Sequence, residues 1–191
     1  MKKRPNRPMD LSLWDNNLEQ SLGASELDTP ERMLAYCREH NFFNGEATDI
    51  EGLINSTPEL DLVFEDLDGF DAYIQKVSDS PTKYRIAINK RHPKKRQRFS
   101  MAHEYIHYQI HRDKIQSMPE GEQIMHRSEE RNNVEATANH FAAELLMPEE
   151  SFKHIARACN GDISKIAECF DVSLLAVRYR AKKLGIEGHG L

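Results

Sequence analysis

Residues 98–108 read Arg-Phe-Ser-Met-Ala-His-Glu-Tyr-Ile-His-Tyr and carry the strongest structural signal in the chain. His103 and His107 are four residues apart, so on a helix they lie one turn apart on the same face. Apolar residues recur around them with the helical period, which predicts a helix over about 99–110. Two imidazoles placed in this way can both reach one metal ion, at about 2.0–2.1 Å from each nitrogen. The stretch therefore predicts a helix that presents two metal ligands.

Glu104 follows the first histidine and is rotated from it by about 100° around the helix axis. It can therefore stand beside the ion without ligating it and accept a proton from the attacking water as a general base. This is the arrangement of an H-E-x-x-H metallopeptidase. The competing interpretation is a chance pattern among the nine histidines of the chain, which the helical context disfavours.

A third ligand is expected from a later helix, because catalytic zinc usually has three protein ligands and one water. Helical periodicity over about 128–146 places Glu135 and Asn139 on one face, beside alanines that allow another helix to approach closely. We therefore expect Glu135 to complete the ligand set. The other acids and histidines that could compete with it are Glu129, Glu130, Glu144, His111, His126 and His140.

Two linked motifs in this order resemble the ImmA/IrrE family of metallopeptidases. The family couples an R-F-[ST]-x-A-H-E-x-x-H helix to an E-x-E-A-N-x-F-A-x-x-L-L-M-P helix. Here the second motif runs Glu135-Ala-Thr-Ala-Asn-His-Phe-Ala-Ala-Glu-Leu-Leu-Met-Pro148. Thr137 departs from the pattern, because the family often has a second acid at that position. The resemblance covers about residues 46–148 and continues more loosely to 186.

This resemblance implies a gluzincin-like site in which His103, His107 and Glu135 hold zinc and Glu104 is catalytic. One Zn²⁺ per chain is the expected cofactor, with Mn²⁺ or another divalent ion as the alternative. The resemblance also implies a cytoplasmic endopeptidase that acts on a protein substrate, typically a helix-turn-helix repressor encoded nearby. No donor for the oxyanion stands out, and the candidates are His140, Tyr105, Tyr108 and His111.

Alternating apolar and polar residues precede the metal-binding helix and indicate a small, mostly antiparallel sheet. We expect Tyr84, Ile86 and Ile88, in the last alternating run, to contact an extended substrate by β-augmentation. An internal core strand is an equally open interpretation of this run. The three alternating runs cover residues 60–66, 71–78 and 83–89.

The chain has 191 residues, which suits one domain with a small appendage. We predict an α+β fold with a zincin-like catalytic domain and C-terminal helices that resemble a helix-turn-helix. The predicted divisions are an N-terminal tail and helices over 1–45, including a weak helix over 10–22, a metallopeptidase domain over 46–150, and a C-terminal helical segment over 151–191.

Residues 163–184 have the pattern of a helix-turn-helix, in which Ser173 can cap the second helix. Because the net charge of the chain is −5 and one short basic helix neutralises few phosphates, we expect DNA binding to be absent or weak. We expect Arg178 and Lys182 to contact a substrate or partner protein instead. The basic residues of this second helix are Arg178, Arg180, Lys182 and Lys183.

A second charge feature is a basic run over 83–98, which follows an acidic stretch over 46–79. We interpret the pair as a charge-segregated surface around the sheet rather than a nucleic-acid site. The other interpretation is a basic rim that attracts an acidic segment of the substrate.

Several classes of protein are disfavoured. No apolar run approaches the length of about 20 residues that spans a membrane, and no signal peptide is recognisable. Three cysteines without an export signal indicate reduced thiols in the cytoplasm. The alternative function is a DNA-binding or toxin–antitoxin or phage-type regulator with a structural or inactive metal site. Four protein ligands would support that alternative, because structural zinc sites are closed.

Overall fold

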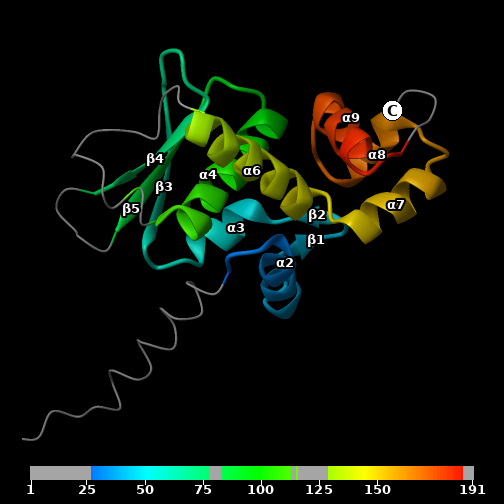
Figure 1. The fold of residues 1–191 in the computed structure, drawn as a ribbon, viewed down its shortest axis with the longest axis horizontal. Coiled ribbons are helices and arrows are strands. Elements are labelled where there is room, and N and C mark those ends of the chain that lie inside the picture. Colours follow the sequence, from blue (N-terminus) through cyan, green and yellow to red (C-terminus); the bar gives the residue numbers. More distant parts are fainter. Residues whose placement is uncertain (1–26, 78–82, 113–114, 116–128, 187–191) are drawn as a thin grey trace, which may run out of the picture.

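The computed structural model describes residues 27–77, 83–112, 115 and 129–186. The helix predicted over 10–22 and the rival ligand His126 lie outside these ranges. The described residues form an α+β fold, as predicted. A three-stranded sheet lies at one end of the molecule and three C-terminal helices lie at the other, with two long helices between them (Figure 1).

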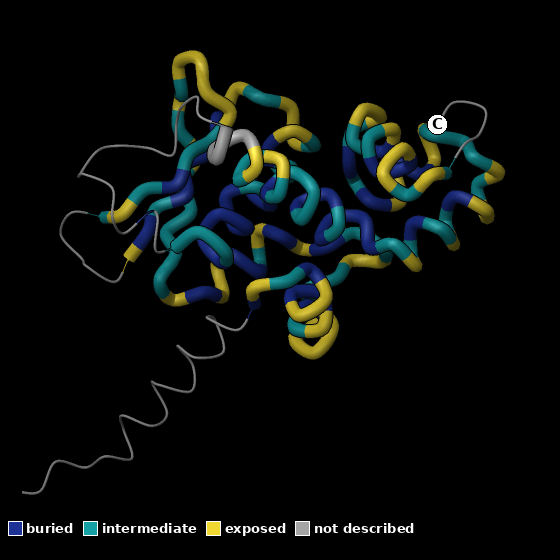
Figure 2. Tube along the Cα trace, in the orientation of Figure 1, coloured by how far each residue is buried: buried dark blue, intermediate teal, exposed yellow. Residues whose placement is uncertain are grey.

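The two central helices are α4 (Lys94–Ile110) and α6 (Glu129–Leu146). They pack against each other, and Ala138 and Ala142 of α6 are fully buried. Small side chains let two helix backbones approach closely, so a carboxylate from α6 can reach the histidines of α4. Buried segments lie in these two helices and also in the sheet and in the N-terminal and C-terminal helices (Figure 2).

The sheet has the strand order β3 (Leu60–Glu65), β5 (Tyr84–Asn89) and β4 (Ala72–Lys76). β4 pairs with β5 in the antiparallel sense, whereas β3 pairs with β5 in the parallel sense. A separate antiparallel hairpin, which the sequence analysis did not predict, joins β1 (Phe43–Asn44) to β2 (Ala47–Thr48). Of these three strand pairs in the described residues, two are therefore antiparallel.

The strand expected to contact substrate is the central one. β5 is paired on both sides, and its Tyr84, Ile86 and Ile88 are buried in the core. A strand with both edges paired has no backbone groups left for an added strand. The expectation that Tyr84, Ile86 and Ile88 contact an extended substrate is therefore wrong, and the internal-strand interpretation is correct.

Two short helices precede the sheet. α2 (Pro30–Glu39) begins after Thr29, whose hydroxyl accepts a hydrogen bond from the backbone N–H of Arg32. α3 (Ile50–Asn55) begins after Asp49, whose carboxylate accepts from the N–H of Gly52 at 2.9 Å. Both are N-caps that satisfy donors in the first helical turn.

The C-terminal part contains α7 (Glu149–Ala158), α8 (Ile163–Cys169) and α9 (Leu174–Lys183). The side chain of Ser173 accepts a hydrogen bond from the N–H of Ala176 at 3.1 Å, so the predicted cap is confirmed. The helices α8 and α9 pack against each other, as the helix-turn-helix pattern predicts. None of the helices described is long and apolar enough to span a membrane.

Acids of the sheet and its β3–β4 connection neutralise much of the basic run. The ion pairs join Arg85 to Asp61 at 2.9 Å, Lys90 and Arg91 to Asp66 at 3.1 and 2.9 Å, and Arg96 to Asp71 at 2.6 Å. This pairing agrees with the predicted charge-segregated surface, because each acidic partner lies within the acidic stretch over 46–79.

Candidate metal centre

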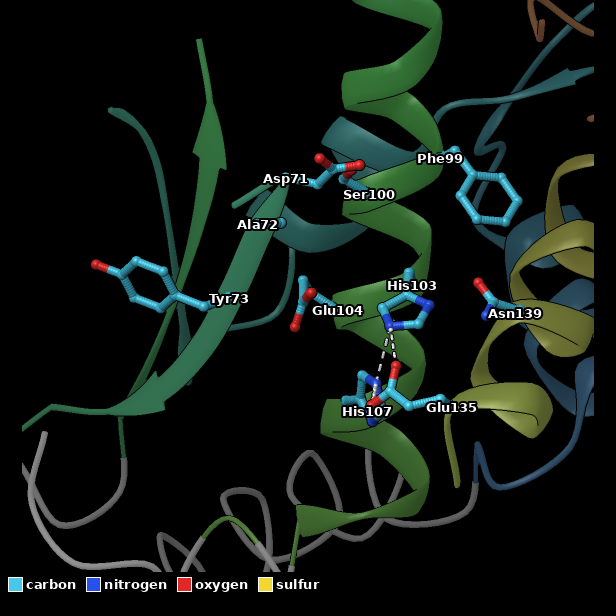
Figure 3. A pocket seen from close by; sticks show the side chains of 10 residues that line it. All are labelled: Asp71, Ala72, Tyr73, Phe99, Ser100, His103, Glu104, His107, Glu135 and Asn139. Atoms are coloured by element: carbon cyan, nitrogen blue, oxygen red, sulfur yellow. Dashed lines mark hydrogen bonds and ion pairs between the residues drawn. The ribbon is translucent and has the colours of Figure 1, made fainter. Parts of the chain in front are cut away.

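Three potential metal-binding atoms lie close together between α4 and α6. The Nε2 atoms of His103 and His107 are 3.0 Å apart. One carboxylate oxygen of Glu135 is 3.2 Å from Nε2 of His103, and the other is 3.4 Å from Nε2 of His107. The three side chains converge on one point (Figure 3), and no other such cluster occurs among the residues that the structure describes.

This spacing suits a metal ion. Tetrahedral ligands at about 2.0–2.1 Å from zinc are separated from each other by about 3.3 Å, close to the three distances between these atoms. Two imidazole nitrogens and one carboxylate oxygen are also a donor set typical of catalytic zinc. The residues therefore fit the ion that the sequence implies.

Hydrogen bonds and charges tie the three ligands together electrostatically. Hydrogen bonds from His103 and His107 hold the pKa of the Glu135 carboxyl well below its usual range. Burial lowers the pKa of His103, but Glu135, Glu104 and Asn139 outweigh this effect, so its pKa is raised. The carboxylate of Glu135 is thus available as a ligand, while protons compete with a metal ion for His103.

Glu104 is buried beside the cluster, between α4 and β4 (Figure 3). Burial raises the pKa of this carboxyl, and the nearby imidazoles of His103 and His107 oppose that rise. A raised pKa makes a carboxylate a stronger acceptor for the proton of a water molecule. Glu104 therefore lies where a general base would act on a water held between the ligands and the open side of the pocket.

A pocket of about 300 Å³ opens onto this cluster. One wall is formed by Ala72 and Tyr73 of β4 and by Asp71, which directly precedes this strand. Asn139 of α6 lies on the opposite side of the pocket (Figure 3). The Tyr73 ring points away from the histidines. The pocket is lined by Asp71, Ala72, Tyr73, Phe99, Ser100, His103, Glu104, His107, Glu135 and Asn139.

Part of this lining was not predicted from the sequence. Ser100 precedes Glu104 by one helical turn, so the helical period could have identified it. The contribution of β4 depends on strand order, which the alternating pattern does not reveal. Asp71 is anchored to α4 by two hydrogen bonds from the Arg96 guanidinium, at 2.6 and 2.8 Å. This pair fixes the start of β4 beside the metal-binding helix.

No rival ligand among the described side chains joins this cluster. Glu144 forms a buried ion pair with Arg180 at the other end of α6. The His111 ring is tilted against the His107 ring, with ring centroids 5.5 Å apart, and His111 lies outside the described lining of the pocket. His140 and the buried Tyr105 and Tyr108 are also absent from that lining, so none of the four oxyanion candidates lines the described pocket.

The C-terminal helices are bonded to both metal-binding helices. Arg98 of α4 donates from Nε to the backbone oxygen of Asp171 at 3.0 Å and from Nη2 to the backbone oxygen of Thr48 at 2.8 Å. Arg180 of α9 binds the Glu144 carboxylate and donates to the backbone oxygen of Met147 at 3.0 Å. Arg180, one of the four basic residues of this helix, is buried by these contacts.

An H-E-x-x-H helix that faces a glutamate from a second helix, in an α+β fold with a small sheet, defines a zincin-like protein with a candidate metal site. A model of the IrrE N-terminal-like domain, a peptidase family, matches residues 57–182. The chain therefore belongs to the ImmA/IrrE family of metallopeptidases. The search of curated proteins finds no match for it.

Proposed function

We propose that the chain is a cytoplasmic zinc-dependent endopeptidase that cleaves a helix-turn-helix transcriptional repressor, or a similar regulatory protein, encoded nearby. The observation that carries the proposal is the convergence of His103, His107 and Glu135 within metal-ligand distance, with Glu104 buried beside them. Membership of a metallopeptidase family supports the same chemistry. The choice of substrate rests on the family resemblance alone.

In the proposed reaction the metal ion and the protein side chains have different roles. Zinc in this site would polarise the scissile carbonyl and lower the pKa of a water molecule. Glu104 accepts a proton from the attacking water and later donates it to the leaving amine, so the C–N bond breaks after the C–O bond forms. His103, His107 and Glu135 keep the reacting groups at one end of the pocket.

β4 is the strand that we propose for substrate binding. Within the described residues it pairs with β5 on one side only, and its residues line the pocket. The backbone oxygen of Asp71 accepts from Asn89, and the N–H of Val77 donates to Lys83. Backbone N–H and C=O groups alternate in direction along an antiparallel strand. Those of Ala72 and Ile74 therefore point to the edge of β4 that faces away from β5. An extended peptide can add there as a further strand.

The proposed activity is tested by incubating the zinc-loaded chain with the repressor-like protein encoded next to it. Mass spectrometry then identifies fragments. Wild type is expected to cleave the repressor, whereas Glu104→Gln should bind one equivalent of zinc and leave the repressor intact, because an amide cannot accept the proton of the water. Glu150→Gln is the matched control, because this side chain on α7 is 92% exposed and should not affect cleavage.

Two results would count against the proposal. Cleavage by Glu104→Gln at the wild-type rate would remove Glu104 from the mechanism or reveal a contaminating protease. A wild-type protein that holds zinc in its three-ligand site but never cleaves the repressor would reject the proposed substrate.

A further inference from the structure

The exposed side of α9 combines leucines with cationic residues. Leu174 and Leu175 are 43% and 75% exposed, and they are two of the four large apolar residues exposed in the described ranges. Arg178 and Lys182 are exposed on the following turns of the same helix. At about 100° per residue, these four residues fall within an arc of about 100° around the helix axis. We call these four residues the α9 stripe.

This stripe is held on a rigid support. Ser173 caps the helix directly before Leu174, and α9 is buried at Val177, Arg180 and Ala181, outside the arc of the stripe. Arg180 is bonded to Glu144 and to the backbone of Met147. The helix therefore cannot rotate to bury its leucines without breaking a buried ion pair, and the stripe is a preformed surface.

The chemistry of the stripe favours a protein partner over DNA. In a helix-turn-helix, residues at the start of the second helix face the base edges, and two leucines there offer no hydrogen-bonding groups. Within the fold, Arg180 is buried, and Nζ of Lys183 lies 5.6 Å from the centre of the Tyr179 ring.

The stripe is complementary to a particular kind of surface. α9 contains no acidic residue, so a partner with carboxylates is attracted and one with cations is repelled. Apolar residues spaced along one helix face are the usual anchors when one helix packs on another. Adjacent leucines followed by cations therefore match a helix that carries both leucine-like side chains and carboxylates.

We propose that the α9 stripe is a docking site for a partner protein, which binds through an acidic amphipathic helix. The stripe is separate from the metal centre, because no residue of α9 lines the described pocket. The inference goes beyond the proposed peptidase function and does not depend on it, so docking can be measured in the Glu104→Gln protein without any cleavage.

The test is fluorescence anisotropy with the full-length chain and a labelled synthetic 21-residue helical peptide, with leucines on one face and glutamates on the other. We expect saturable binding that weakens about tenfold with Leu175→Gln, as expected from the loss of one buried leucine contact. Lys182→Glu should also weaken it about tenfold by charge repulsion. Lys83→Glu, a charge reversal at an exposed lysine preceding β5, should change the affinity less than twofold.

Three further probes decide between partners: a scrambled peptide of the same composition, a peptide with lysine in place of glutamate, and a duplex DNA. All three should bind at least tenfold more weakly than the acidic peptide. Circular dichroism should show that each variant remains folded, since all three substituted side chains are exposed. The proposal is overturned if the scrambled peptide binds as well, if neither variant weakens binding, or if the DNA binds more tightly than the acidic peptide.

Discussion

His103 gives the most direct access to the metal centre, because its Nε2 atom lies 3.0 Å from His107 and 3.2 Å from Glu135. We expect His103→Ala to lose the zinc, since two ligands remain where a catalytic site usually has three. His154→Ala, a change at an exposed histidine of α7, is the matched control and should retain one equivalent. Elemental analysis of both variants after gel filtration is the measurement. One equivalent of zinc in His103→Ala would show that the ligand set is wrong.

Asn139 is positioned to orient this histidine. The Nδ1 atom of His103 is buried and has no hydrogen-bond partner of standard geometry among the described residues, while the Asn139 side chain points toward the ring (Figure 3). Metal-binding histidines usually donate from their second nitrogen to a nearby acceptor. We expect Asn139→Leu to weaken zinc binding by about tenfold to a hundredfold.

Asn139→Asp should keep most of the zinc affinity, because it retains an acceptor oxygen of similar reach. The affinities are measured by competition with a zinc chelator, which does not depend on catalytic activity. If Asn139→Leu binds zinc as tightly as the wild type, Asn139 has no part in orienting His103.

Individual residues differed in how far the sequence could predict their positions. The four-residue interval between His103 and His107 determines their relation on any helix, so their proximity follows from local geometry. Glu135 lies on a different helix, so its proximity to the two histidines does not follow from local geometry. It was predicted from the order of the two helix motifs in the family. The burial of Arg180 was not predictable, because it depends on where the end of α6 presents Glu144.

At the scale of elements, the contact between α6 and α9 has a measurable energetic consequence. Arg180 is 1% exposed and its partner Glu144 is largely buried, so removing the cation leaves a carboxylate without its partner. We expect Arg180→Met to reduce the free energy of unfolding by about 3–5 kcal/mol. Thermal or urea unfolding measures this change.

The double variant Arg180→Met with Glu144→Gln provides the control, because it removes both charges together. It should be less destabilised than the sum of the two single variants, which is the signature of a direct interaction. Strict additivity of the two single changes would contradict the assigned ion pair.

The helices were easier to predict than the arrangement of the strands. Thr29, Asp49 and Ser173 are capping residues whose effect is local, so the starts of α2, α3 and α9 were predictable. Alternation along a strand shows that one of its faces is buried, but it does not show which strands lie beside it in the sheet. The parallel pairing of β3 with β5 depends on the path of the chain, so β5 could not be distinguished from an edge strand.

For the whole molecule, contacts of the C-terminal helices with α4 and α6 are relevant to the predicted division of the chain into a metallopeptidase domain and a C-terminal segment. The family match covers 57–182, so it continues past the division predicted at residue 150. Arg98 connects the metal-binding helix to the turn before α9, through Asp171. The separate C-terminal segment stays a prediction, and in the structure this segment is attached to the helices that carry the candidate ligands.

The central claim is that this chain holds one divalent ion through three side chains and leaves a position open for water. The most direct measurement is an anomalous difference map at the zinc edge, from crystals grown with one equivalent of zinc. We expect one strong peak, bound by His103, His107 and Glu135 and by a non-protein oxygen at about 2.0–2.2 Å. A peak with four protein ligands, or one located away from these three residues, would contradict the account and favour a structural metal site.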